Sequence, residues 1–257
     1  MTRCIFLGPS LPIAQARAIC DGVYLPPARQ GDILLALRDH QPHAIALIDG
    51  FFEQVPAVWH KEILWALRQG VVVVGGSSMG ALRAAELSQF GMVGVGKIFE
   101  AYRSGCFPPF DHELFEDDDE VAVVHGPQET NYAGTVAMVD IRTSLAAAEN
   151  QGVITTACRD HLAILAKGLF YKQRTYKALL DLGRGSGEFL GEVERLSGWL
   201  MQGAVSQKAA DAVELLRFLS QDNLKAPIPD FRFEHSSVWE EALMALETPP
   251  GPTEGDG

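Results

Sequence analysis

Val71-Val72-Val73-Val74-Gly75-Gly76-Ser77-Ser78-Met79-Gly80 is the stretch of sequence that decides the predicted fold. Its four consecutive valines predict a short strand buried on both faces of a parallel sheet, because β-branched residues favour strands. The residues from Met79 to Leu87 are helix formers, so the chain must turn from strand to helix within about three residues. Ser78 lies at this turn.

The turn matches the pattern G-x-S-x-G over Gly76–Gly80. In a nucleophile elbow, the glycines permit a strained turn between strand and helix that exposes the serine hydroxyl. The backbone N–H groups of Met79 and Gly80 belong to the first turn of the helix and are candidates for holding an oxyanion. The alternative is structural, because Ser77 or Ser78 can also be the N-cap of this helix.

Four further segments have the apolar character of strands, and helical patterns lie between the earlier ones. They are Cys4–Leu7, Val23–Leu25, Ala44–Ile48 and Val121–Val124. Helices are predicted over residues 11–20, 31–38 and 56–69. This alternation predicts an α/β fold, with a parallel sheet of about five strands and flanking helices.

After about residue 135 the helical patterns follow one another directly. They cover residues 138–149, 156–170, 174–182, 188–201 and 206–219, with a possible strand over 137–140. We therefore expect an α/β core over residues 1–145 and a helical C-terminal layer or subdomain over 146–225. The last region, 226–257, is expected to hold a short helix from Ser237 to Leu246 and a disordered tail rich in Pro and Gly.

In a parallel sheet the loops that follow the strands meet at one rim, where ligands bind. The predicted strands place Gly8–Ser10, Asp49, Ser78 and His125 at this rim. Asp49 and His125 are therefore acidic and imidazole candidates near the serine. The backbone N–H of Gly50 is a second candidate donor to an oxyanion, because glycine permits close approach.

The predicted helix over residues 56–69 carries apolar side chains on more than one face. At about 100° per residue, His60 lies at the edge of the stripe that faces the sheet, and Glu62 lies on the outer face, so these two are not expected to pair. Val58 and Trp65 also lie on the outer face. Large apolar groups there predict docking against another part of this chain or against a partner.

The composition excludes several classes of function. The formal net charge of −12 and the lack of a basic tract argue against binding to nucleic acid or anionic lipid. No apolar run approaches the ~20 residues that span a bilayer, and the N-terminus has no signal-peptide pattern, so we expect a cytoplasmic protein. The four cysteines include no C-x-x-C pair, and no structural zinc site is expected.

Two local features are lesser candidates. Cys106 lies in a loop and is the one thiol considered for reactivity. The acidic run Glu116–Glu120 predicts a solvated turn before the segment 121–124. Its alternatives are a site for a hard cation and a dock for a basic surface.

Several motifs, taken in order, resemble the TfuA-like core domain, and the resemblance covers residues 3–145. These motifs are Ile48–Phe51, Val58–Leu64, Gly76–Glu86, Phe90–Gly94 and Asp118–Ala122. The resemblance implies an accessory protein of a YcaO enzyme, which uses ATP to activate a peptide-bond amide. The outcome would be a backbone thioamide in a ribosomally made precursor peptide or another protein, with no cofactor held by this chain.

For this chain the resemblance implies sulfur supply, by hydrolysis of the thiocarboxylate of a small ThiS-like sulfur carrier. Ser78 would attack the carbonyl, the N–H groups of Met79, Gly80 and Gly50 would hold the oxyanion, and hydrosulfide would leave. His60 is the first candidate for the general base, because it lies within a family-like motif. His125 is the second candidate.

Asp49 is the first candidate for the acid that orients the base, ahead of Glu100 and Asp119. Arg83 is a candidate for steering the carboxyl terminus of the carrier. An ion pair with Glu86 on the same helix is the alternative for Arg83.

Three hypotheses are compatible with these residues. The first is a serine-type (thio)acyl hydrolase that releases sulfide for a YcaO partner. The second is a non-catalytic adaptor or allosteric activator of YcaO, in which Ser78 only caps a helix. The third is a persulfide relay through Cys106.

Overall fold

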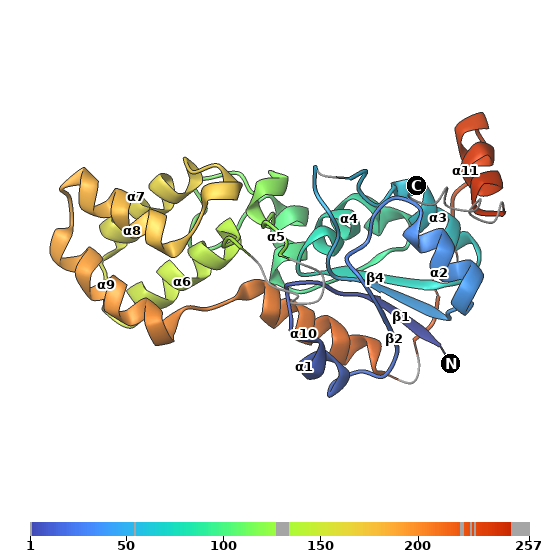
Figure 1. Cartoon of the computed structure of the whole chain (residues 1–257), viewed down its shortest axis with the longest axis horizontal. Helices are drawn as coiled ribbons and strands as arrows, with labels where there is room; N and C mark the ends of the chain where they lie inside the picture. Colours follow the sequence, from blue (N-terminus) through green and yellow to red (C-terminus); the bar gives the residue numbers. More distant parts are fainter. Residues whose placement is uncertain are drawn as a thin grey trace, which may run out of the picture.

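The computed structural model describes residues 2–53, 55–126, 134–221, 224–226, 228 and 230–247. Five strands form one sheet: β1 (Arg3–Phe6), β2 (Val23–Leu25), β3 (Ala44–Leu47), β4 (Val72–Gly76) and β5 (Val93–Val95). Their order is β2-β1-β3-β4-β5, and each pairing is parallel. The predicted α/β class is confirmed, since helices flank the sheet and a helical region follows it (Figure 1).

The predicted position of the fifth strand is wrong. Residues 121–124 are largely buried but form no strand, and they follow a short 3-10 helix, Asp118–Glu120. The fifth strand lies instead within the glycine-dense segment 90–96 and pairs with β4, with Val95 opposite Gly76. A short apolar run is as compatible with a buried loop as with a strand, so its composition alone did not separate the two.

The helices that flank the sheet are α1 (Ile13–Arg17), α2 (Asp32–His40), α3 (His60–Arg68), α4 (Met79–Leu87) and α5 (Lys97–Ser104). Helix α3 begins at His60, four residues later than predicted, and α5 was not predicted. Because α3 begins there, Glu62 falls in its first turn and accepts a hydrogen bond from the N–H of Trp59 at 2.9 Å. Glu62 is 1% exposed, so its predicted place on the outer face is wrong.

The two faces of the sheet are covered by different helices. Helices α2, α3 and α4 pack on the face that presents Phe6 and Val73. Helix α1 and the late helix α10 (Gln207–Leu219) pack on the face that presents Ile5 and Val74, below the sheet in Figure 1. Since α1 has five residues, α10 supplies most of this layer after the chain returns from the helical region.

The remaining helices are α6 (Met138–Asn150), α7 (Thr156–Lys167), α8 (Tyr176–Ser186), α9 (Leu190–Gly203) and α11 (Ser237–Glu247), with 3-10 helices at Ser88–Phe90 and Tyr171–Gln173. The possible strand at 137–140 is wrong, because α6 begins there. Helices α6 to α9 gather at one end of an elongated molecule (Figure 1). Within the described ranges, no helix has the length and apolar character needed to cross a membrane.

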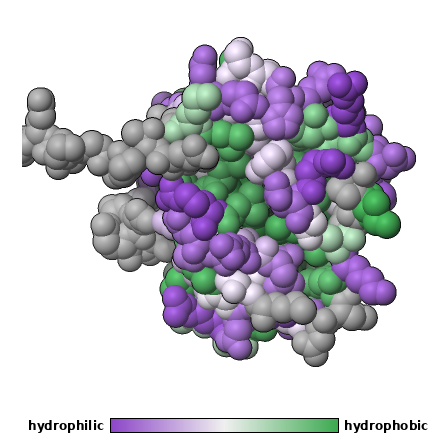
Figure 2. Space-filling model, turned by 90° about the vertical axis from the view of Figure 1, so that its right-hand side faces the viewer, coloured by the Kyte–Doolittle hydropathy of each residue, from purple (hydrophilic) through white to green (hydrophobic). Residues whose placement is uncertain are grey.

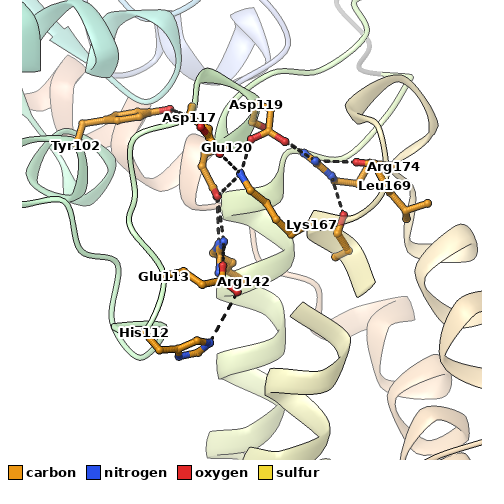
Figure 3. Close-up of polar contacts among 11 residues, drawn as sticks. Tyr102, His112, Glu113, Asp117, Asp119, Glu120, Arg142, Lys167, Leu169 and Arg174 are labelled. Carbon is orange, nitrogen blue, oxygen red and sulfur yellow. Dashed lines mark hydrogen bonds and ion pairs between the residues drawn. The ribbon is translucent and has the colours of Figure 1, made fainter. Parts of the chain in front are cut away.

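An ion-pair network joins the acidic run to the helical region (Figure 3). Arg142 of α6 donates to both carboxylate oxygens of Glu120, at 3.1 and 3.0 Å, and both side chains are buried. Lys167 of α7 contacts Glu120 at 2.9 Å, and Arg174 contacts Asp119 at 2.7 Å. The expected solvated turn is therefore confirmed only for Glu116–Asp118, which are exposed, whereas Asp119 and Glu120 dock onto basic side chains of this same chain.

Helix α11 covers the outer side of α3. Trp65 packs against Phe233 and Trp239, with ring centroids 5.1 and 5.6 Å away. The outer side of α3, which was predicted to dock, thus meets the chain's own C-terminal segment. Val58 lies before the start of α3 and is buried. Figure 2 views the end of the molecule that carries α2, α3 and α11, and hydrophobic surface is visible near its centre.

Removing one partner of the Arg142–Glu120 pair should destabilise the protein strongly. Arg142→Met leaves a buried carboxylate with fewer partners, and we expect the free energy of unfolding to fall by about 3 kcal/mol. The double variant Arg142→Met/Glu120→Leu removes both charges and should recover most of this loss. Urea denaturation of the three proteins measures the coupling, and a double variant less stable than Arg142→Met would refute it.

Candidate active site

Asp49 ties together the loops that follow β1 and β3. One of its carboxylate oxygens accepts hydrogen bonds from the N–H groups of Gly8 (2.8 Å) and Ser10 (3.2 Å), and the other accepts from Ser10 Oγ (2.6 Å). The helices that follow β1 and β3 lie on opposite faces of the sheet. This rim is therefore the switch point of the sheet, where ligands bind in open α/β folds.

Ser77 forms the sharp turn between β4 and α4. Its φ is +68°, a left-handed conformation that is uncommon for a serine, and the N–H of Ser78 donates to the carbonyl of Gly76 at 2.8 Å. A hydrogen bond between residues two apart defines a γ-turn, and the form with positive φ is rare and strained. Ser77 Oγ donates to the carbonyl of Lys208 at 2.8 Å, so this hydroxyl is committed to holding α10.

Ser78 carries a hydroxyl without a hydrogen-bond partner in the described part of the chain. It precedes α4 directly, yet its side chain makes no capping hydrogen bond. The residue is 2% exposed. Its oxygen is not among the fully buried, unpartnered side-chain atoms, which are Arg3 Nε, Arg142 Nη1 and Trp239 Nε1 over the described ranges. Ser78 Oγ is therefore almost fully enclosed and keeps only slight exposure.

The N–H groups at the turn are not equally available to an oxyanion. Gly80 donates its N–H to the carbonyl of Ile48 at 3.2 Å, so its predicted role as an oxyanion donor is wrong in this conformation. The N–H groups of Met79 and Gly50 have no acceptor among the residues described. A Cβ on Gly50 would lie 2.7 Å from Met79 Cγ, so these two residues are in close contact. Their N–H groups therefore remain the two candidate oxyanion donors at this rim.

His125 lies in the surroundings of Asp49, although it does not follow a strand as predicted. Its ring packs against that of Phe51, with the centroids 5.0 Å apart. Burial lowers the pKa of His125, Asp49 opposes this, and Lys208 lowers it further. The net lowering of the pKa keeps the imidazole neutral at neutral pH, which is the form that accepts a proton.

His60 of α3 and Arg83 of α4 both contact Glu86, near the end of α4 that is far from Ser78. His60 Nε2 lies 2.8 Å from a carboxylate oxygen of Glu86, and the same oxygen accepts a hydrogen bond from Arg83 at 2.8 Å. Glu86 is eight positions beyond Ser78, roughly 12 Å along a helix axis. The structure thus does not bring His60 to the serine, and the ion pair that was the alternative for Arg83 is present.

Lys208 is a residue of this rim that the sequence did not indicate. It lies at the start of α10, is buried, and donates from Nζ to the carbonyl of Val121 at 2.8 Å. Burial lowers the pKa of Lys208, while Asp49 and Asp140 act in the opposite direction. No local pattern marked it, because it reaches the rim only through the packing of α10 under the sheet.

A cavity of about 210 Å³ lies beside Lys208, between the loop after β1 and the helical region. Its polar lining includes Ser10, Asp140, Tyr176 and Lys208. Asp140 also holds the start of α10, since it accepts hydrogen bonds from the N–H of Lys208 (3.1 Å) and from Ser206 Oγ (3.0 Å). The helical region therefore forms one wall of the rim.

The other candidate chemistry is weaker. Cys106 Sγ donates to Asp111 at 2.9 Å, and this hydrogen bond, with burial, raises the pKa of the thiol. A raised pKa disfavours the thiolate that a persulfide relay needs. Glu100 pairs with Arg103, and Asp119 pairs with Lys167 and Arg174, so neither is free to orient a base at the rim. Across the described residues, no group of three or more His, Cys, Asp or Glu is placed to hold a metal ion.

The fold and the rim define the class: an open, parallel α/β protein with a serine at a strained turn from strand to helix. A comparison with protein families matches residues 49–175 to the family described as TfuA-like protein, and this match supports assigning the chain to that family. The resemblance predicted from its motifs is confirmed. The match supports a role as an accessory protein in thioamide biosynthesis, in association with partner proteins. A search of curated proteins finds none that matches the chain.

The turn should tolerate no side chain at Gly80. A Cβ there would lie 1.7 Å from the carbonyl oxygen of Leu47, a backbone atom that cannot move aside cheaply. Gly80→Ala should therefore lower the free energy of unfolding by more than about 3 kcal/mol. Gly185→Ala is the matched control, because a Cβ at this position in α8 meets nothing within 4 Å, and it should be neutral or stabilising by up to about 1 kcal/mol. Equal effects in thermal unfolding would show that the contact at Gly80 is not tight.

Proposed function

We propose that this chain acts in the cytoplasm, where it hydrolyses the thiocarboxylate of a ThiS-like sulfur carrier and supplies sulfide to a YcaO enzyme. The observation that carries the proposal is the hydroxyl of Ser78, which has no partner in the described chain and lies at a strained turn. The next residue, Met79, has an N–H with no acceptor in the described chain. A hydroxyl, a neutral imidazole and free amide donors at one rim are the groups that acyl transfer requires.

The proposed reaction has two steps. In the first, Ser78 Oγ attacks the thiocarboxylate carbon while His125 takes the serine proton, and the N–H groups of Met79 and Gly50 hold the oxyanion. The tetrahedral intermediate breaks its C–S bond, and sulfur leaves as hydrosulfide with the proton from His125. In the second, His125 deprotonates water, which cleaves the Ser78 ester and leaves the carrier with an ordinary carboxylate. His125 then returns the proton to Ser78.

Asp49 is proposed to position His125 electrostatically rather than to bind it. Its carboxylate oxygens are engaged by Gly8 and Ser10, and its negative charge favours the imidazolium that forms during each step. Burial, and to a smaller extent Lys208, oppose this effect of Asp49 on the pKa of His125 and keep the resting imidazole neutral. Asp49 and Lys208 thus have opposite effects on the protonation of His125: Asp49 favours the imidazolium and Lys208 favours the neutral imidazole.

The slight exposure of Ser78 favours a particular kind of substrate. With 2% of the residue exposed, an acyl group in the middle of a folded chain cannot approach the hydroxyl. A thiocarboxylate at the very end of an extended tail is thin enough to enter. This is the form in which a sulfur carrier presents its sulfur.

Ser78→Ala should abolish sulfide release. With a purified ThiS-like carrier thiocarboxylate as substrate and a fluorogenic sulfide probe, we expect kcat/KM to fall at least about 10³-fold, because the nucleophile is lost. Ser88→Ala, at the other end of the same helix, is the matched control and should retain full activity. Undiminished release by Ser78→Ala would reject the hydrolase and favour the adaptor, provided that the variant still supports thioamidation by YcaO.

His125 should set the acid limb of the pH profile. Since its pKa is lowered from the ordinary value of 6.5, kcat/KM should remain high at pH 6.5 and fall only as the pH drops through the lower pKa. In His125→Gln, kcat/KM should fall about 10²- to 10⁴-fold, and the acid limb of the pH profile should disappear. His60→Gln should preserve both the rate and the limb. The reverse pattern would make His60 the base, as the sequence first indicated.

A further inference from the structure

The edge strand β5 lies along a large groove. Strand β5 ends the sheet order, so its outer edge pairs with no strand of the described residues. A groove of about 990 Å³ follows it over Val93–Gly96 and continues along α5. An exposed strand edge is a template for pairing with another extended chain.

The walls of this groove suit a slender occupant. Helix α6 presents Thr143, Ala146 and Ala147 to it, and α10 presents Glu214 and Phe218. The alanines leave room beside the strand, and Phe218 adds apolar contact. An extended peptide with small side chains fits this shape, because one edge of its backbone can pair with β5 while its side chains meet the two helices.

Charge and direction identify which end of a peptide lies at the rim. Lys97 lines the groove just beyond the carboxyl end of β5 and makes no ion pair with any described residue. A segment that continues the parallel pattern of the sheet brings its own carboxyl end to this lysine. Because Val95 lies opposite Gly76, that end also arrives at the rim where the turn to Ser78 begins.

We propose that the groove along β5 binds the extended carboxyl-terminal tail of the carrier, as a sixth strand parallel to β5 with the terminal carboxylate or thiocarboxylate at Lys97. The identity of the partner rests on the proposed function. The terminus is held at Lys97 in a first complex, and it leaves Lys97 when the last residues of the tail turn over the end of β5 toward Ser78. Lys97 is thus a binding residue and takes no part in the chemistry.

Binding can be measured apart from catalysis in the Ser78→Ala protein. The probe is a fluorescently labelled ThiS-like carrier that ends in an ordinary carboxylate, and its Kd is measured by fluorescence anisotropy. Ala147→Trp fills the groove and should raise Kd at least about tenfold, whereas Ala157→Trp on the exposed side of α7 should not. Asn150→Trp, at the exposed end of the same groove, gives a second obstruction if Ala147→Trp does not fold.

Charge reversal tests the direction of the tail. Lys97→Glu should raise Kd about tenfold for the carboxylate carrier and much less for a carrier with an amidated terminus, and Lys177→Glu should change neither. Carrier binding should also slow hydrogen exchange of the amides of Val93–Val95. Unchanged Kd in both tryptophan variants, or equal effects of Lys97→Glu on the two carriers, would overturn the proposal. If those results occur while sulfide release still requires Ser78, the groove assignment fails and the hydrolase stands.

Discussion

The close approach of two backbones, at the start of α4 and the end of β3, is the constraint on which the rim depends. The N–H of Gly80 donates to the carbonyl of Ile48 at 3.2 Å, and the space where a Cβ would lie is filled by the carbonyl of Leu47. With α4 held this close, the chain has one residue, Ser77, in which to reverse direction. The strain stored there is compensated by packing on both sides, and Ser78 is presented at a fixed place as a result.

The helical region completes this rim. Helix α10 returns beneath the sheet and brings Lys208 to Asp49 and His125, while its Asp211 accepts a hydrogen bond from the N–H of Ile98 at 2.8 Å and so caps α5. The ion pairs of the acidic run join the same region to the segment that leads to His125. Neither part of the chain forms the candidate site alone, and disturbance of either should affect both the stability and the chemistry of the rim.

Sequence patterns predicted the elements whose signal is local. The valine run, the three earlier strands and the later helices follow from apolar periodicity, and the turn at Ser78 follows from its glycines. Strand β5 was missed because glycine and a three-residue length leave little strand signal. Lys208 was missed because its contact with Ser77, 131 positions earlier in the chain, leaves no mark in either segment. Glu62 was misplaced because the start of α3, which puts this residue in the first turn, is decided by tertiary packing.

We propose an acyl-transfer site at the switch-point rim of the parallel sheet, with a groove beside it that guides a tail. This proposal requires a covalent ester on Ser78. Intact-mass spectrometry and peptide mapping of acid-quenched mixtures with a carrier thiocarboxylate test this most directly. A transient species should appear with the mass of the protein plus the carrier less one H₂S, and the ester should map to Ser78. Sulfide release without such a species, or an ester on another residue, would show that Ser78 is not the nucleophile.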